Sequence, residues 1–262
     1  MSILIALACT LAATAEAPAY TTAGDTVQLF NGKNLDGWYT YLKDRGRNVD
    51  PNVVFSVAEG AIHISGQEFG CITSDAEFEN FRIVVEFKWG GKTCPPRVEN
   101  ARDSGLLLHS TGADGAYGGM WMHSMEFQII EGGTGDFLVV GDGSDAFSLT
   151  SPILPRKEGG PNIFHPGGTP ETIHGGRIDW YDRDPAWKDV RGFRGAKDVE
   201  KPFGEWNTIE GIALGDTLTA IVNGVVVNQA RGVTPHKGRI QIQSEAAEIL
   251  IRRVEITPIA PK

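Results

Sequence analysis

The clearest pattern in the chain is a strict alternation of side chains over residues 81–89. The apolar residues are Phe81, Ile83, Val85, Phe87 and Trp89, and the residues between them are Arg82, Val84, Glu86 and Lys88. Successive side chains of a β-strand point to opposite sides of the sheet. The pattern therefore predicts a strand with one face buried in a core.

Shorter runs of the same kind recur along the chain, with turn-forming residues between them. They cover residues 27–30, 53–57, 61–64, 137–140, 207–213, 217–222, 238–245 and 247–256. The Asn223-Gly224 pair between two apolar runs is typical of a two-residue hairpin. No stretch has the period of a helix and no internal repeat is present. Ten or more short strands predict an all-β jelly-roll sandwich of two antiparallel sheets.

The run over residues 122–130 carries polar side chains on one face. Ser124, Glu126 and Gln128 share that face, and the opposite face is mostly apolar. A carboxylate and a carboxamide would then lie two residues apart on one surface. Two interpretations remain open at this point: a working site, or ordinary solvent-facing residues of a half-buried sheet.

The preceding expected strand, residues 103–109, fits the first interpretation. Its alternation places Asp103 and His109 on one face. If the two strands pair across the glycine-rich bend at residues 112–119, a His, a Glu and a Gln could converge on one side of the sheet. We expect the site there.

Composition and charge narrow the class of protein. The chain has 262 residues, 41% apolar and 22% charged, with 33 glycines that suit many tight turns. This length is enough for one large all-β domain, which we place at residues 25–260. The net charge of −9 and the lack of a basic patch argue against a nucleic-acid partner.

Residues 1–17 have the pattern of a secretory signal peptide. The first thirteen residues are almost wholly apolar, and small residues around position 15 offer a cleavage site. The run is too short to span a membrane as a helix. Cys9 raises the question of a lipid anchor, but Ala6 stands where a lipobox prefers Leu. We expect a periplasmic or secreted protein.

An exported protein would keep Cys71 and Cys94, which could form a disulfide. The alternative is two unrelated thiols, since Cys94 lies in a proline-rich segment. The pattern does not decide between the two.

The periodicity is lost over residues 141–205, which are rich in Gly, Pro and Asp. A long segment without regular elements often carries function or covers a site. Trp180 and Trp187 lie in it, and aromatic rings beside Asp and Arg suit the recognition of sugars. The other interpretation is that these tryptophans attach the loop to the sandwich.

The six residues from Glu126 to Glu131 resemble the Glu-x-Asp-x-x-Glu strand of laminarinase-type glucanases, which are also jelly rolls. Gln128 replaces the central Asp, and a neutral amide cannot tune its neighbours by charge. A retaining glycosidase needs two carboxyls that flank the scissile bond. A conventional glucanase is therefore an alternative, and Gln128 counts against it.

A wider resemblance rests on several motifs in a fixed order. They are Leu29-Phe-Asn-Gly-Lys-Asn-Leu-Asp-Gly-Trp38, Asp103-Ser-Gly105, Glu126-Phe-Gln-Ile-Ile130, Gly204-Glu-Trp-Asn207, Asn223-Gly224 and Gly238-Arg-Ile-Gln-Ile-Gln243. Over residues 27–258 the chain resembles the 3-keto-disaccharide hydrolase family. The resemblance implies a concanavalin A-like jelly roll that acts on glycosides whose C3 hydroxyl has been oxidised to a ketone.

A ketone at C3 acidifies the proton on C2, so a single base can start the reaction. The enolate expels the C1 substituent and water then adds, which gives net hydrolysis. We assign Glu126 as the base and His109 as proton donor or enolate partner. Gln128, Ser124 and Trp180 are expected to bind the sugar.

Asp103 and Arg102 stand at the entrance of their strand as supporting residues. Among the histidines, His109, His123, His165 and His174 have no spacing typical of a metal site. A calcium ion held by loop carboxylates is a further expectation, with Glu126 as one ligand. A carbohydrate-binding module without catalysis is the main alternative function, since jelly rolls serve both uses.

Overall fold

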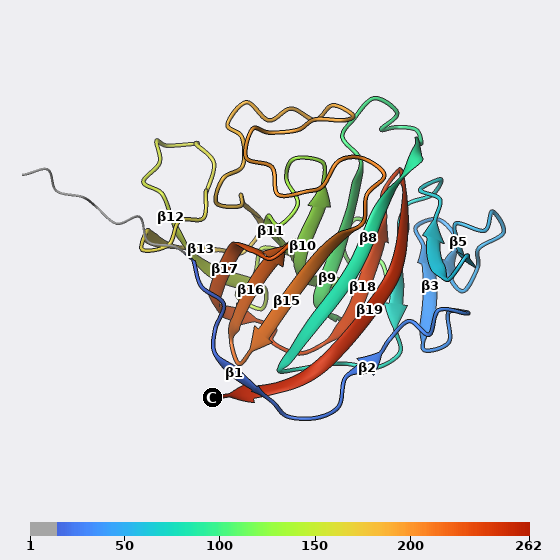
Figure 1. The fold of residues 1–262 in the computed structure, drawn as a ribbon, viewed down its shortest axis with the longest axis horizontal. Coiled ribbons are helices and arrows are strands. Elements are labelled where there is room, and N and C mark those ends of the chain that lie inside the picture. The colour runs from blue at the N-terminus through green and yellow to red at the C-terminus, as the bar shows by residue number, and fades with distance from the viewer. Residues whose placement is uncertain (1–14) are drawn as a thin grey trace, which may run out of the picture.

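The computed structural model describes residues 15–262, which form two antiparallel sheets packed face to face (Figure 1). No helix occurs within these residues. The architecture is the concanavalin A-like jelly-roll sandwich predicted from the sequence. Both sheets contribute apolar side chains to one interior, as expected when each sheet buries one face.

The first sheet has eleven strands, ordered β13-β12-β17-β16-β15-β8-β19-β6-β5, with β1 and β2 also paired to β19. Their bounds are β1 Tyr20–Thr22, β2 Val27–Gln28, β5 Phe55–Ala58, β6 Ala61–Ile64, β8 Phe81–Thr93, β12 Ser148–Ile153, β13 Thr169–Ile173, β15 Asn207–Leu214, β16 Thr217–Val222, β17 Val225–Thr234 and β19 Ala247–Pro261.

The second sheet has eight strands, ordered β14-β11-β10-β9-β18-β7-β3-β4. Their bounds are β3 Trp38–Leu42, β4 Gly46–Arg47, β7 Gly70–Ser74, β9 Asp103–Thr111, β10 His123–Ile130, β11 Phe137–Val140, β14 Gly176–Ile178 and β18 Arg239–Ser244. The strands β10, β9 and β18 are central in it.

Alternating side chains build the core as predicted. Phe81 and Phe87 of β8 face Phe127 of β10 across the interior, and all three are fully buried. Asn223 and Gly224 form the two-residue turn between β16 and β17, both with positive φ, as a type I′ hairpin requires. The core-facing residues of β8 and β10 and the hairpin between β16 and β17 could therefore be predicted from the alternation along the sequence.

Residues 141–205 differ from the loop expected there. They contain three short strands, β12, β13 and β14, and the irregular part is confined mainly to residues 179–206. Proline and glycine disrupt the period in this region, but edge strands tolerate both. Strand β3 was also missed, because its side chains are buried on both faces and do not alternate.

Three other points of the sequence analysis can be compared with the structure. Cys71 and Cys94 are both free thiols, which agrees with the alternative of two unrelated thiols and not with a disulfide: Cys71 is buried on β7 and Cys94 follows β8. Within residues 15–262, no helix is long and apolar enough to cross a membrane. The signal peptide and Cys9 fall mainly or wholly outside the described residues.

Candidate functional site

The site is built on the side of the eight-stranded sheet that faces away from the core. We call this side the polar face and define it by Asp103 of β9, Glu126 and Gln128 of β10, and Gln241 and Gln243 of β18. Cross-strand pairing fixes their relation: Glu126 lies opposite Leu107, and Gln128 lies opposite Gly105. Leu107 in turn lies opposite Gln241. All five defining residues are buried.

Gly105 allows side chains from the two neighbouring strands to approach each other at the centre of the polar face. A Cβ added at this position would overlap the Oε1 atoms of both Glu126 and Gln243. Because glycine has no side chain, a carboxylate and an amide from the strands on either side of β9 approach each other above its backbone. Glu126 and Gln243 therefore act as neighbours although β9 separates their strands.

The side chain of Gln243 is fully buried beside Glu126, and its proximity lowers the pKa of that carboxyl. Within residues 15–262 neither atom of its amide has a partner in good hydrogen-bond geometry. Buried amides are normally paired, and an unpaired one costs about 1–3 kcal/mol. Unpaired donors and acceptors next to a carboxylate are what a site for a hydroxylated ligand offers.

Two further carboxyls stand beside Gln243. The backbones of Asp103 and Glu245 form an isolated antiparallel β-bridge, which places the two residues opposite each other. The guanidinium of Arg97 contacts the carboxylate of Asp103 at 2.9 Å. Burial, and next the charge of Glu245, raise the pKa of Asp103 well above its usual value. Burial likewise raises the pKa of Glu245 to about 7. The pair therefore retains a proton more readily than free carboxyls do.

Glu126 is a second predicted site residue whose carboxyl has a raised pKa. It is 4% exposed, and burial, followed by the charge of Glu245, raises its pKa to about 8. Arg177 acts in the opposite direction and lowers the pKa. A carboxyl with a pKa near neutrality can both take and give a proton, which is the property of a general acid or base.

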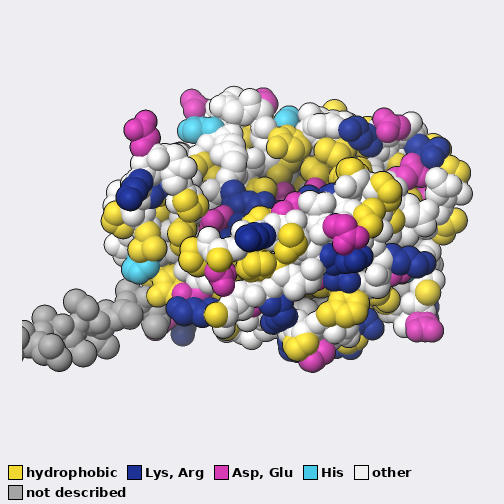
Figure 2. All heavy atoms as spheres, turned by 90° about the horizontal axis from the view of Figure 1, so that it is seen from above, with side chains coloured by type: hydrophobic (Ala, Val, Ile, Leu, Met, Phe, Trp, Pro, Cys, Tyr) yellow, Lys and Arg dark blue, Asp and Glu magenta, His cyan; other side chains and the backbone are white. Residues whose placement is uncertain are grey.

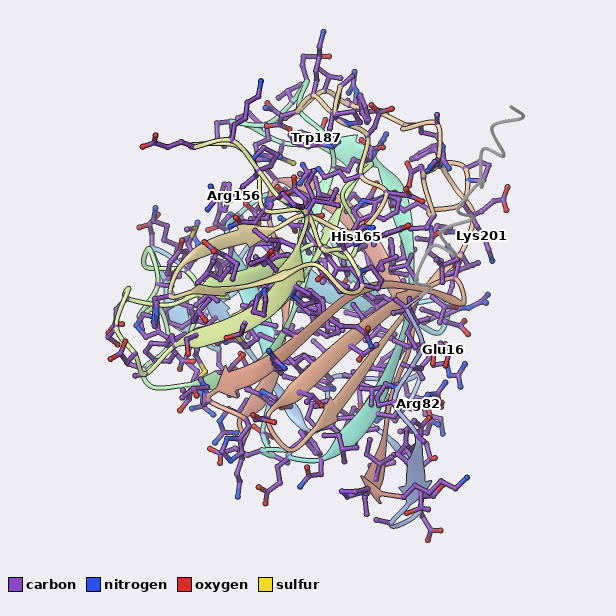
Figure 3. All side chains as sticks on the ribbon, turned by 90° about the vertical axis from the view of Figure 1, so that its left-hand side faces the viewer. Glu16, Arg82, Arg156, His165, Trp187 and Lys201 are labelled. Carbon is purple, nitrogen blue, oxygen red and sulfur yellow. The ribbon has the colours of Figure 1, made fainter. Side chains whose placement is uncertain are left out.

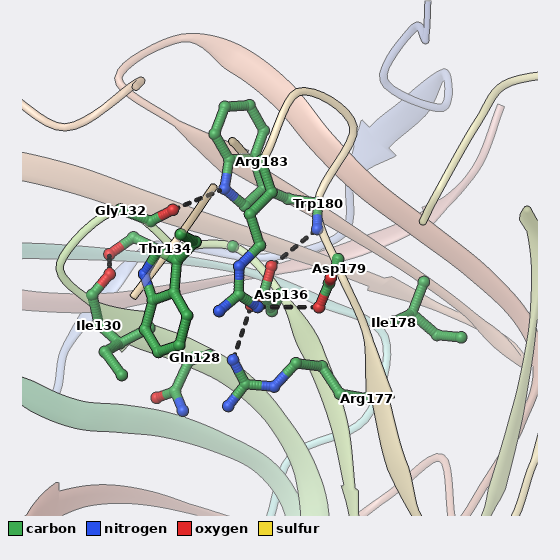
Figure 4. A network of polar contacts seen from close by, with 12 residues as sticks. Gln128, Ile130, Gly132, Thr134, Asp136, Arg177, Ile178, Asp179, Trp180 and Arg183 are labelled. Carbon is green, nitrogen blue, oxygen red and sulfur yellow. Dashed lines mark hydrogen bonds and ion pairs between the residues drawn. The ribbon is translucent and has the colours of Figure 1, made fainter. Parts of the chain in front are cut away.

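Arg177 belongs to an ion-pair network at the β14 edge of the sheet (Figure 4). Its guanidinium contacts Asp136 at 2.9 Å, and Arg183 contacts the same carboxylate oxygen. The backbone N–H of Trp180 donates to the other oxygen of Asp136 at 2.7 Å. One buried carboxylate thus attaches residues 177–183 to the start of β11 and orients Arg177 beside the polar face.

Space lies next to this network. A depression of about 570 Å³ is lined by Pro161, Ile163, Arg177, Asp179, Arg183, Asp184, Pro185 and Trp187. Figure 2 shows a hollow between the loops, with basic and acidic side chains lying together inside it. The irregular segment of residues 179–206 forms part of the wall of this depression.

His109 is not brought to the polar face, contrary to the expectation. Its φ is 55°, and the registers of β18 and β10 against β9 both shift beside it. This bulge breaks the alternation, so the ring packs edge-to-face on Phe81 of the core, 5.8 Å between centroids. Burial lowers the pKa of His109 to about 4, and Nδ1 bonds the carbonyl of Pro235.

Trp180 and Arg102 also make contacts that stabilise the fold, and neither lies on the polar face. Trp180 is 2% exposed within the core, so it attaches the loop to the sandwich and offers no ring to a sugar. Arg102 forms a 2.6 Å ion pair with Glu131. Glu131 accepts in addition from the backbone N–H groups of Arg102 and Gly192. The carboxylate of Glu131 is therefore occupied by the side chain of Arg102 and by two backbone N–H groups. It does not act together with Glu126 as a glucanase mechanism would need.

Ser124 lies on the same side as Glu126 and is buried, with a hydroxyl that has no partner in the described part of the chain. Sequence reasoning missed Gln243, Glu245 and Arg177. The first two could have been found, because they alternate with isoleucines in an expected strand. Arg177 could not, since it lies in a region that showed no period.

A metal site is not evident. Among residues 15–262, no group of three or more His, Cys, Asp or Glu side chains is placed to hold an ion. Burial raises the pKa of Asp103, Glu126 and Glu245, and the charge of Glu245 adds to the rise for the other two, but Arg97 and Arg177 already supply positive charge to this group. The residues present fit a proton-transfer site better than the expected calcium site.

The fold of the chain is similar to that of known solved structures. Two solved candidate glycosyl hydrolases from Parabacteroides distasonis ATCC 8503 are 17% and 19% identical, with TM-scores of 0.51 and 0.50. Each match covers 89% of this chain, and 93% and 98% of the other chains. At this identity the likeness concerns the fold alone. No curated protein matches the sequence.

A family model described as the 3-keto-alpha-glucoside-1,2-lyase-like domain matches residues 25–257, nearly all of the described chain. This agrees with the resemblance drawn from the ordered motifs. The chain belongs to the family of the 3-keto-alpha-glucoside-1,2-lyase-like domain.

Proposed function

We propose that the protein cleaves 3-keto-glycosides by elimination followed by addition of water, with Glu126 as the base. The observation that carries the proposal is a buried carboxyl whose pKa is raised to about 8 and which lies beside the buried amide of Gln243. A conventional glycosidase would need a second carboxyl across the bond, and Glu131 is engaged elsewhere. Membership of a glycosidase-like family supports the same reading.

The chemistry balances with the groups on the polar face. Glu126 takes the C2 proton, the C–H electrons form the C1=C2 bond of the enone, and the C1–O bond breaks. The leaving oxygen takes a proton from the Asp103–Glu245 pair and departs as an alcohol. Water then adds hydroxide to C1 and a proton to C2. Gln128 and Gln243 would donate to the sugar oxygens, including the enolate.

The test is product analysis with purified protein, a 3-keto-disaccharide and its unoxidised parent, with and without chelator. We expect a 3-keto-monosaccharide from the oxidised substrate only. Cleavage of the parent would instead favour a glucanase. Binding of both without products would favour a carbohydrate-binding module. The chelator arm tests the calcium expectation, and export to the periplasm or beyond remains a prediction.

The pH dependence follows from the raised pKa of Glu126. A base must be ionised to accept a proton, so kcat/KM should rise with pH as Glu126 ionises toward pH 8. It should fall again where the Asp103–Glu245 pair loses the proton that the leaving oxygen needs, which gives a bell-shaped profile. The profile is measured on wild type with the 3-keto-disaccharide. A profile without a rising limb below pH 8 would contradict the assignment of Glu126 as the base.

A further inference from the structure

Asp103 and Glu245, which we call the acid pair, supply the proton for the leaving oxygen in the proposed reaction. We infer that Asp189 is a positioning residue for the acid pair and acts on it through Arg97. The inference rests on the proposed function and adds a residue that the mechanism above does not use. A continuous set of contacts carries it, from the irregular segment of residues 179–206 to the polar face.

The guanidinium of Arg97 lies between Asp103 and Asp189. Its Nη2 contacts Oδ2 of Asp103 at 2.9 Å and Oδ1 of Asp189 at 3.1 Å, and its Nη1 donates to the other oxygen of Asp189 at 3.4 Å. Oδ1 of Asp103 is buried and has no partner within residues 15–262. Arg97 therefore holds one oxygen of Asp103 and leaves the other oxygen free for the substrate.

Further hydrogen bonds fix Asp189 beside Arg97. Its carboxylate accepts from the side-chain N–H of Asn100 at 2.7 Å and from the backbone N–H of Ala101 at 3.0 Å. Figure 3 shows Trp187, two residues before Asp189, among the loops at one end of the molecule and far from Arg82 of β8. Asp189 thus connects this loop end to the start of β9, where Asp103 begins the strand.

Sharing one guanidinium between two carboxylates has an electrostatic consequence. A positive charge beside a carboxyl stabilises its ionised form, and an acid must keep its proton until the leaving oxygen takes it. Arg97 lowers the pKa of Glu245, and the negative charge of Asp189 acts in the opposite direction. The other charges that act on the acid pair are those of Glu126 and Arg177. Asp189 therefore lets Arg97 orient the acid pair while the pair keeps its proton.

The consequence is a dependence of rate on the leaving group. An alkoxide needs a proton as the C1–O bond breaks, whereas p-nitrophenolate departs without one. Removal of the C2 proton by Glu126 is common to both kinds of substrate. A weakened acid should therefore slow the methyl 3-keto-glycoside and spare the p-nitrophenyl 3-keto-glycoside of the same sugar.

The test is Asp189→Asn, which keeps the shape of the side chain and removes its charge. We expect kcat/KM for the methyl glycoside to fall about tenfold, a part of the 100-fold to 10,000-fold that a positioned acid contributes, and the p-nitrophenyl glycoside to change by less than about twofold. The falling limb of the pH profile should move to lower pH, because Arg97 then favours the ionised acid pair. A residue that only stabilised the fold would slow both substrates alike and leave this limb in place.

The matched control is Asp182→Asn, the same change at a half-buried residue of the same segment that pairs with Lys197 at 2.8 Å. Both substrates should stay within about twofold of wild type. Arg97→Lys is a second variant, because one ammonium cannot contact two carboxylates as a guanidinium does. It should show the same selective loss on the methyl glycoside.

Thermal unfolding reports whether each variant is folded, and if Asp189→Asn is not, Arg97→Lys decides by the same criterion. With wild type active, equal loss on both glycosides, or no loss on either, would overturn the inference while the proposed function stands. A selective loss of the same size in Asp182→Asn would also overturn it. If wild type cleaves neither glycoside, the proposed function fails and the inference fails with it.

Discussion

Replacing Glu126 by Gln should lower kcat/KM for a 3-keto-disaccharide by about 100-fold to 10,000-fold. This is the usual contribution of a positioned acid or base, and the amide keeps the shape while losing the ability to take the C2 proton. The fold should remain intact, because an ionised carboxyl is disfavoured at this buried position and a neutral amide is not. The measurements are steady-state kinetics and thermal unfolding of both proteins.

The matched control is Glu210→Gln, the same change at a half-buried glutamate of β15 that pairs with Arg82. That residue lies in the other sheet, so activity should stay within about twofold of wild type, since surface ion pairs contribute about 0–1 kcal/mol. A Glu126→Gln protein that is folded and retains more than a tenth of the activity would exclude Glu126 as the base.

Replacing Trp180 by Ala should lower the free energy of unfolding by about 3–5 kcal/mol, as removal of a buried aromatic side chain usually does. Trp180 is 2% exposed, packs in the main core and donates its indole N–H toward the carbonyl of Gly132. Its backbone N–H also binds Asp136. Loss of the ring should therefore loosen residues 177–183 together with Arg177. Urea unfolding gives the stability.

Trp187→Ala is the comparison for this change. Trp187 is only partly buried, with Arg183 stacked at 4.3 Å from its ring centre, so about 1–2 kcal/mol is expected. Trp180→Phe, which retains a ring, should lie between the two. If Trp180→Ala left stability unchanged and reduced only sugar affinity, the ring would have to be exposed to the ligand, contrary to its burial.

The working side of the sheet could be predicted because alternation is a local property. The patterns around Glu126 and Gln128 placed both residues on the face where the structure has them. The position of His109 could not be read in the same way. The bulge at His109 has a positive φ, which is usually a glycine position, and no glycine marks it here, so the reversal depends on how β10 and β18 pair with β9.

For residues 141–205, too, local sequence features were informative, whereas contacts between distant segments could not be predicted. Composition indicated that residues 141–205 lie near the site, but it gave no reason to separate Trp180 from Trp187. Their difference arises because Asp136, more than forty residues earlier, binds the backbone of Trp180 and both neighbouring arginines. Such a contact between distant segments leaves no periodic trace in the sequence.

The place of β19 has a consequence for how the chain assembles. This last strand lies between β8 and β6, and it also pairs β1 and β2. The early hairpin β5–β6 therefore has no route into the large sheet until residues 247–261 have left the ribosome. Contacts this far apart in sequence slow folding and favour completion after synthesis. Until then the apolar strands of the large sheet lack their neighbours, and unpaired strand edges of this kind can pair with other chains.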